Sequence, residues 1–187
     1  YPEVSKTVHD YFDITRHYET MSSICSVRNS INTVDAFYEA ETDFFNENGP
    51  LLQNSFNLYE KELVKSPFRL ELEKEFGKYF FTKIETGLAV FDEILVPELI
   101  KENKLTTEYD KLIASAKIDY KGSTYNLSQM GIFTSSKDRE VRRESSSLVA
   151  SFFEDNEETF DRIYDELVSV RDKQAKLMGF DNYVEFG

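Results

Sequence analysis

Apolar residues recur at steps of three and four along most of this chain, and this spacing limits the fold more than any other feature. The first run holds Val8, Tyr11, Phe12, Ile14 and Tyr18, and similar runs continue almost to the end of the sequence. Residues three or four apart share one face of an α-helix. Seven glycines and four prolines are too few for the many tight turns of a β-sandwich or barrel. We therefore predict an all-α fold, a multi-helix lobe that is more than about 60% helical.

Several local signals divide this helical pattern. The first helix is expected to break near residues 21–23. Residues 48–50, Asn-Gly-Pro, are expected to end the next helix, because glycine adopts a left-handed cap and proline cannot continue a helix. Thr106 or Thr107 is expected to cap a later helix. Gly179 is expected to close a long helix as its left-handed cap.

One segment departs from the helical period. Residues 118–120 and 124–127 alternate apolar with polar side chains, and Lys121, Gly122 and Ser123 lie between them. This pattern predicts one small β-hairpin at residues 118–127, packed on helices because an isolated hairpin is only marginally stable. No repeat or linker divides the rest, so residues 1–187 are expected to form one helical region.

The charge balance excludes several classes of partner. The chain has 22 basic and 35 acidic residues, a net charge of −13. Such a surface repels nucleic acid and anionic membrane, so neither is expected as a partner. No apolar run approaches the length of a membrane span. The single cysteine, Cys25, cannot form an internal disulfide, and this favours a reducing compartment and a cytoplasmic location.

His9, Asp13 and His17 are the only arrangement with metal-ligand character. They are four residues apart, so they share one face of the first helix and could hold a metal ion. Two histidines and an acid arise easily on a helix of a highly charged chain, and no fourth ligand is suggested. A solvated helix face is therefore a better interpretation of these three residues than a metal site.

Cys25 and the acidic residues give no better catalytic site. Nothing near Cys25 except Arg28 favours a thiolate, so we expect a small packing residue. The acids around residues 154–158 lack the glycine and alternating ligands of a calcium loop and are expected to be solvated. No catalytic, cofactor-binding or metal-binding residue is predicted. A part of a larger enzyme, a helical interaction module and a helical spacer all remain open.

A specific run of residues lies near the end of the chain: Leu167-Val168, Arg171, Ala175, Leu177-Met178-Gly179-Phe180 and Asn182-Tyr183. This run resembles the segment Leu-Val-x-x-Arg, Ala, Leu-Gly-Tyr/Phe-x-Asn-Tyr/Phe of the oligoendopeptidase F branch of the thimet-oligopeptidase-like zinc metallopeptidases. Residues 66–73, 118–127 and 135–143 are similar to other parts of the branch, in the same order.

The resemblance implies a helical peptidase that cleaves short peptides in a deep channel. Such enzymes bind zinc through His-Glu-x-x-His and a downstream Glu, and the zinc activates a water molecule. Neither His9 nor His17 is followed by Glu, and no His-x-x-x-His occurs. We therefore expect residues 1–187 to be the N-terminal helical region of a larger peptidase, cut at both ends and lacking the catalytic zinc domain.

The same resemblance sets the expected partners. They are the missing C-terminal catalytic domain and oligopeptide substrates, whose channel this region helps to shape. The full-length enzyme is expected to use zinc, whereas this fragment alone is expected to bind none and to be inactive. Its uncovered apolar tail, which includes Phe180, Tyr183 and Phe186, can then promote self-association. The alternative is a stand-alone helical protein-interaction module.

Overall fold

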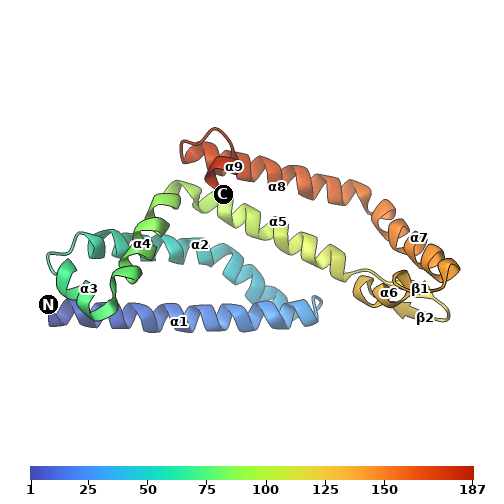
Figure 1. The fold of residues 1–187 in the computed structure, drawn as a ribbon, viewed down its shortest axis with the longest axis horizontal. Coiled ribbons are helices and arrows are strands. Elements are labelled where there is room, and N and C mark those ends of the chain that lie inside the picture. The colour runs from blue at the N-terminus through green and yellow to red at the C-terminus, as the bar shows by residue number, and fades with distance from the viewer. The chain divides into compact units, whose positions relative to one another are not determined.

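The computed structural model describes all residues 1–187 and is 81% helical, with a single two-stranded sheet. This confirms the all-α fold with one small hairpin. In chain order the elements are α1 (Pro2–Ile31), α2 (Ala36–Val64), α3 (Arg69–Phe76), α4 (Lys78–Val90), the 3-10 turn η1 (Glu93–Leu95), α5 (Val96–Ala114), β1 (Ile118–Tyr120), β2 (Ser123–Tyr125), α6 (Leu127–Thr134), α7 (Arg139–Asp155), α8 (Glu157–Leu177) and α9 (Tyr183–Phe186) (Figure 1). None of these helices combines the length and apolar character needed to cross a membrane.

The contacts within the chain group into two compact units. Unit 1 contains residues 1–101 and 171–187, and unit 2 contains residues 102–170. Each unit is described by itself below.

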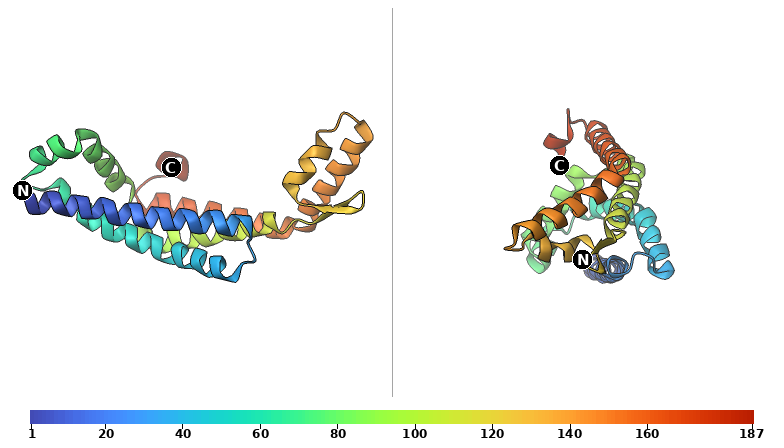
Figure 2. Two further views of the ribbon diagram at one scale, coloured as in Figure 1. Left: turned by 90° about the horizontal axis from the view of Figure 1, so that it is seen from below. Right: turned by 90° about the vertical axis from the view of Figure 1, so that its right-hand side faces the viewer.

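Unit 1 is built on the pairing of α1 with α2, which run side by side in opposite directions (Figures 1 and 2). Its core joins four helices through Val8 of α1, Leu63 of α2, Leu72 of α3, and Phe81 and Ile84 of α4. Aromatic side chains surround this core, with ring centres 5.0 Å apart for Phe12 and Phe80. The apolar stripes predicted from the sequence therefore meet at the end of the pair where α1 begins and α2 ends.

The first helix does not break near residues 21–23, and that prediction was wrong. Helix α1 continues to Ile31, because Cys25 and Asn29 extend its buried face beyond the serines. The chain turns instead at residues 32–35, where the Asp35 carboxylate accepts hydrogen bonds from the backbone N–H groups of Phe37 and Tyr38. An aspartate that caps the next helix was a stronger boundary signal than two serines.

The predicted stop at residues 48–50 was also wrong, because α2 passes through it. Pro50 is buried inside the helix. A Cβ atom on Gly49 would lie only 2.8 Å from the hydroxyl oxygen of Tyr18 on α1. Glycine at this position therefore permits the close approach of two helices rather than ending one of them.

Thr106 and Thr107 lie inside α5 and do not cap a helix, contrary to the prediction. The Thr106 hydroxyl donates to the carbonyl oxygen of Glu102, one turn earlier, at 3.0 Å. Gly179, in contrast, ends α8 as predicted, with φ of +85°. Phe180 N–H then donates to the carbonyl oxygen of Ala175 at 2.9 Å, which is the Schellman pattern of a glycine-capped helix end.

Unit 2 contains the predicted hairpin, but the turn is Lys121-Gly122 alone, and the second strand runs from Ser123 to Tyr125 rather than over 124–127. Ile118 pairs with Tyr125, and Tyr120 pairs with Ser123. Lys121 and Gly122, between them, both have positive φ, as the two-residue turns of tight hairpins require. Ile118 and Tyr120 pack against the buried Met130 of α6, a short helix that the sequence analysis did not anticipate.

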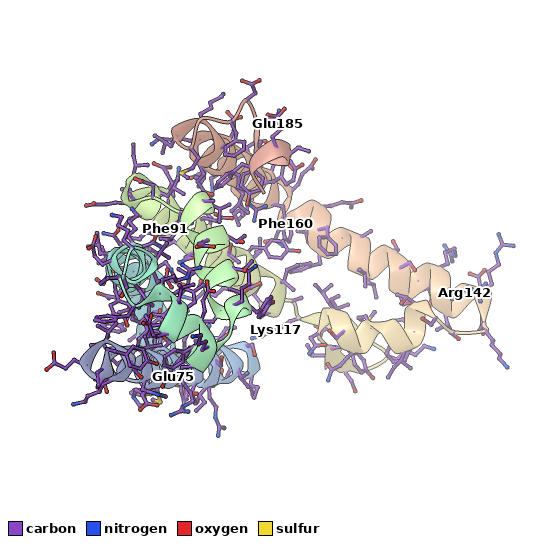
Figure 3. The ribbon with its side chains drawn as sticks, turned by 60° about the vertical axis from the view of Figure 1, so that its left-hand side comes forward. Glu75, Phe91, Lys117, Arg142, Phe160 and Glu185 are labelled. Atoms are coloured by element: carbon purple, nitrogen blue, oxygen red, sulfur yellow. The ribbon has the colours of Figure 1, made fainter.

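Helix α7 begins where polar side chains cap it. The Asp138 carboxylate accepts hydrogen bonds from the backbone N–H groups of Glu140 and Val141. Arg142, labelled in Figure 3, donates to the carbonyl oxygens of Ser136 at 2.6 Å and Lys137 at 2.9 Å. The Tyr120 hydroxyl donates to Glu144 of α7 at 3.2 Å, so this helix also anchors the hairpin.

Candidate binding site between helices α1 and α2

The structure does not bring His9, Asp13 and His17 together as a metal site. His9 Nε2 lies 3.4 Å from a carboxylate oxygen of Glu75 on α3, and its ring packs edge-on against Phe76. Asp13 accepts a hydrogen bond from Arg16 at 2.6 Å. No group of three or more His, Cys, Asp or Glu side chains gathers where it could hold a metal ion. The residues described here therefore do not fit a catalytic zinc, which needs three protein ligands.

Cys25 is a buried packing residue, as expected. Its Sγ lies 3.4 Å from the hydroxyl oxygen of Thr42 and 3.8 Å from the carbonyl oxygen of Tyr38, both on α2. These neighbours include no general base that could activate a thiol.

The acidic residues around the junction of α7 and α8 are exposed, as expected for a solvated face. Glu154 and Asp155 lie in the last turn of α7, and Glu157 and Glu158 lie in the first turn of α8. Acids in a first helical turn are favoured by the helix dipole.

An apolar groove lies between α1 and α2, with a volume of about 540 Å³. Ile14, Tyr18, Met21, Phe45 and Leu52 line it, and Asp13 and His17 are the charged or polar residues at its wall. The rings of Tyr18 and Phe45 meet edge-on, with centres 5.5 Å apart. His17 is therefore part of an apolar surface rather than of a metal-binding cluster.

A second, smaller and more polar cavity of about 230 Å³ lies beside this groove. Its polar side chains come from both helices: Tyr11, Thr15, Tyr18 and Glu19 from α1, and Gln53 and Glu60 from α2. Leu52 and Phe56 supply apolar wall, and Gly49 leaves the space that a side chain would fill.

Glu60 is the unusual group of this cavity. Only 8% of the residue is exposed, and its Oε1 accepts a hydrogen bond from the Tyr11 hydroxyl at 2.6 Å. Burial raises the pKa of Glu60 above the usual glutamate value, and the Tyr11 hydrogen bond opposes this shift. Burial, followed by the hydrogen bond to Glu60, also raises the pKa of Tyr11. The site thus contains a buried carboxylate with little compensation for its charge.

This cavity was not predicted from the sequence. Tyr11 lies on the predicted apolar stripe, but Glu60 was not among the predicted site residues. A signal was present: Phe56, Glu60 and Leu63 are spaced by four and three, so the acid interrupts the buried face of α2. An acid at an apolar position of a helical stripe is a candidate for a buried, functional carboxylate.

Beyond this site, large apolar side chains are exposed at the end of the α1–α2 pair where the chain turns from α1 into α2. We call this the far end of the pair. The exposed side chains are Ile24, Val27, Ile31, Val34, Phe37 and Phe44. Ile24, Val27 and Ile31 lie on α1 outside the face that buries Cys25 and Asn29, Val34 lies in the turn, and Phe37 and Phe44 lie on α2. This uncovered surface is of the kind that marks contact with another protein or domain.

Known proteins are similar to this chain in sequence and in fold. A profile of the Peptidase M3 N-terminal domain matches residues 1–91. A crystal structure assigned as an oligoendopeptidase F from Bacillus anthracis strain Ames is 43% identical, with a TM-score of 0.93 over 97% of this chain. Another structure assigned as an oligoendopeptidase F is 45% identical, with a TM-score of 0.88 over 93% of this chain. PZ peptidase A, solved with an inhibitor, is 43% identical, with a TM-score of 0.88 over 93%. No curated protein matches the chain.

The length of these relatives limits what the match covers. The chain spans 33% of the Bacillus anthracis structure and 31% of each of the other two. The match covers nearly all of this chain at more than 40% identity, and the profile matches its first 91 residues to the N-terminal domain of these peptidases. In sequence and fold, this chain is similar to the N-terminal region of the oligoendopeptidase F-like peptidases of family M3.

Proposed function

We propose that this chain is the N-terminal region of a zinc oligoendopeptidase that hydrolyses short peptides, and that the catalytic groups lie outside residues 1–187. The observation that carries the proposal is the match at 43–45% identity over 93–97% of the chain to three peptidase structures. The sequence contains no His-Glu-x-x-His, so on this proposal the zinc ligands belong to another part of the protein.

The role that we assign to this region is to form part of the wall of the substrate channel. The exposed apolar side chains at the far end of the α1–α2 pair support contact with a catalytic domain, which would remove them from water. The apolar groove lined by Tyr18, Met21 and Phe45 offers a further surface of the same character. On this proposal the region guides and restricts peptides but does not cleave them. The single buried cysteine is compatible with the cytoplasmic location that we predict.

The coding sequence beyond codon 187 gives the first test. The proposal requires His-Glu-x-x-His and a later Glu ligand there, and a product that binds zinc and cleaves a fluorescence-quenched oligopeptide. The 187-residue chain should show neither stoichiometric zinc nor cleavage. Zinc bound by this chain, with activity lost in His17→Ala, would contradict the proposal.

The alternative function is a stand-alone helical protein-interaction module, which the exposed apolar residues also favour. The two functions differ in what covers this surface. Hydrogen exchange of the longer product should show protection of residues 24–37 that the 187-residue chain lacks, if a catalytic domain packs there. A product without the zinc motif, and without this added protection, would favour the interaction module.

A further inference from the structure

We propose that the small cavity between α1 and α2 binds an organic cation, an ammonium or guanidinium group, with Glu60 as its counter-ion. The proposal concerns the cavity alone and does not depend on the peptidase function. The ligand could be a free amine or a lysine or arginine side chain of a peptide, and the experiments below separate these sources.

The charge of the cavity carries the first step of the argument. Glu60 is more than nine-tenths buried, and its only hydrogen bond is the one that Oε1 accepts from Tyr11. A carboxylate has two oxygens that accept about four hydrogen bonds, and Oε2 has no donor from the protein. Oε2 is not among the fully buried unpaired atoms, so it is accessible from the cavity. Burying an ionised group without such compensation is costly. A cation placed against Oε2 would supply both the donor and the opposite charge.

Nothing else in the cavity neutralises Glu60. Of the residues that line it, none is a lysine or arginine, and Glu19 adds a second carboxylate at the exposed side of α1. The cavity therefore has a negative potential within a chain that is itself acidic. This potential attracts cations and excludes anions such as phosphates or free carboxylates.

The walls select an organic cation over a metal ion. The rings of Tyr11, Tyr18 and Phe56 line the space, and aromatic faces attract ammonium and guanidinium groups. Calcium instead needs about six to eight oxygen ligands around it, and no cluster of three acidic or histidine side chains occurs in this protein. Thr15 also lines the cavity, and its buried hydroxyl lies beside that of Tyr11, so its oxygen can still accept a hydrogen bond from the ligand.

The size of the cavity limits the ligand. Its volume of about 230 Å³ is below the range of about 300–1,000 Å³ that drug-sized ligands and cofactors occupy. It suits the end of one lysine or arginine side chain, or a small free amine, and is too small for a nucleotide or a folded peptide segment.

The test uses methylguanidinium and butylammonium as probes, with N-methylurea and butanol as neutral analogues of similar shape. Each is titrated into the 187-residue chain, and chemical shifts of the backbone amides are followed. The cations should cause saturable shifts in residues 11–19 and 49–60, and the neutral analogues should bind at least about 10-fold more weakly. Equal binding of cation and neutral analogue, or no binding, would overturn the proposal.

A pair of variants tests the role of Glu60. Glu60→Gln should weaken binding of methylguanidinium at least about 10-fold, because it removes the counter-ion. Glu62→Gln is the matched control: it removes the same charge from the same helix, but Glu62 is exposed and pairs with Lys65. It should leave the affinity within about 2-fold. Loss of binding in both variants would show a general charge effect and overturn the site.

A second variant covers the case in which Glu60→Gln does not fold. Thr15→Val preserves the shape of the side chain and removes only its hydroxyl group. It should weaken methylguanidinium binding by about 3- to 10-fold without shifting that of tetramethylammonium, which donates no hydrogen bond. Unchanged methylguanidinium binding in Thr15→Val would place the cation elsewhere and overturn the proposal.

The source of the cation is tested with blocked tripeptides. Gly-Arg-Gly amide, with an acetyl group at its start, is compared with the same peptide carrying citrulline, the neutral analogue of arginine. If the arginine peptide binds more tightly than methylguanidinium and the citrulline peptide does not, the ligand is a peptide side chain. If the free cation binds more tightly than the arginine peptide, the ligand is a small amine. Tighter binding of the citrulline peptide would contradict the proposal.

Discussion

The two ends of the α1–α2 pair have the same apolar period but very different burial. At the near end, where α1 begins and α2 ends, Val8 is fully buried, together with Leu63, Leu72 and Phe81. At the far end Ile24 is 46% exposed, Val27 57% and Ile31 74%. At the near end α3 and α4 supply Leu72 and Phe81 to the core, whereas at the far end the buried residues of α1 are Cys25 and Asn29, and Ile24, Val27 and Ile31 lie outside that buried face.

This comparison teaches that helical periodicity predicts which face of a helix is apolar, but not whether that face is covered. Burial requires a second element with a matching face, and that element can come from elsewhere in the protein. The near end is a completed core. The far end is the surface that we assign to contact with the catalytic domain.

The largest expected difference between the two ends is in the cost of removing an aliphatic side chain. Leu72→Ala should lower the free energy of unfolding by about 2–5 kcal/mol, because it leaves a cavity in a closed core. Ile31→Ala, the matched change at the far end, should alter it by less than about 0.5 kcal/mol. Urea unfolding of both variants, followed by circular dichroism, measures the difference.

A cost of Ile31→Ala similar to that of Leu72→Ala would break the comparison. It would mean that the far end is covered in solution, by self-association of the chain. Repeating the measurement at several protein concentrations would identify this case, because the stability of an associated chain rises with concentration.

The next expected difference is in local opening, for which Cys25 is a natural probe. Cys25 is 5% exposed, and its Sγ lies beside Tyr38 and Thr42 of α2. Because these contacts lie outside the core that joins four helices around Val8, the thiol should become reactive through an opening that costs roughly a few kcal/mol less than global unfolding. The rate of reaction with a disulfide reagent, compared with the global stability, gives this opening free energy.

A Val8→Cys, Cys25→Ser variant places the single thiol at the near end as a control. Its reaction should follow global unfolding, since Val8 lies in the core shared by four helices. Equal opening free energies for the two positions would show that the α1–α2 pair unfolds as one unit and would remove the distinction between its ends.

The features that the sequence predicted correctly depend on neighbours in the chain. The hairpin follows from alternation and from the Lys121-Gly122 turn, and both residues have the positive φ that this turn requires. Gly179 likewise caps α8 through bonds to residues within the preceding turn. In both cases the local sequence contains all the groups that determine the conformation.

The features that were predicted wrongly or missed depend on residues far along the chain. Gly49 resembles a helix stop, and only the position of Tyr18 on another helix shows that it permits close packing. The burial of Glu60 similarly requires Tyr11, 49 positions away, to donate to it. The absence of a zinc motif, by contrast, was visible directly in the sequence.

A smaller effect is expected from the charge of Glu60, which is buried between the helices. Glu60→Gln retains an oxygen that can accept from Tyr11 and removes the buried charge, so we expect a gain of about 1 kcal/mol at neutral pH. Burial raises the pKa of Glu60 in the folded state, so its charge destabilises the fold above that pKa. The gain should therefore disappear as the pH falls below the usual glutamate value of 4.5.

Thermal unfolding of Glu60→Gln at neutral and acidic pH measures this gain, with Glu62→Gln as the exposed control. A loss of stability at neutral pH would mean that Glu60 already has a cationic partner in the chain. That result would also explain why no external cation is needed there.

The smallest expected effect concerns Glu75, which binds the start of α1. Glu75 is exposed and has a lowered pKa, whereas Glu60 is buried and has a raised pKa. The Tyr1 hydroxyl donates to its carboxylate, Ser5 Oγ donates at 2.8 Å, and His9 lies 3.4 Å away (Figure 3). These hydrogen bonds, that from Tyr1 most of all, lower the pKa of Glu75. A carboxylate with a lowered pKa stabilises the fold above its unfolded pKa, and this contribution disappears as the pH falls through the folded value.

Glu75→Gln should therefore lower the midpoint of thermal unfolding slightly at neutral pH and leave it unchanged in acid, whereas Glu60→Gln should raise it at neutral pH. Because Glu75 is exposed, added salt should reduce its effect but not that of Glu60. Midpoints that move in the same direction for the two variants would show that burial does not distinguish these glutamates.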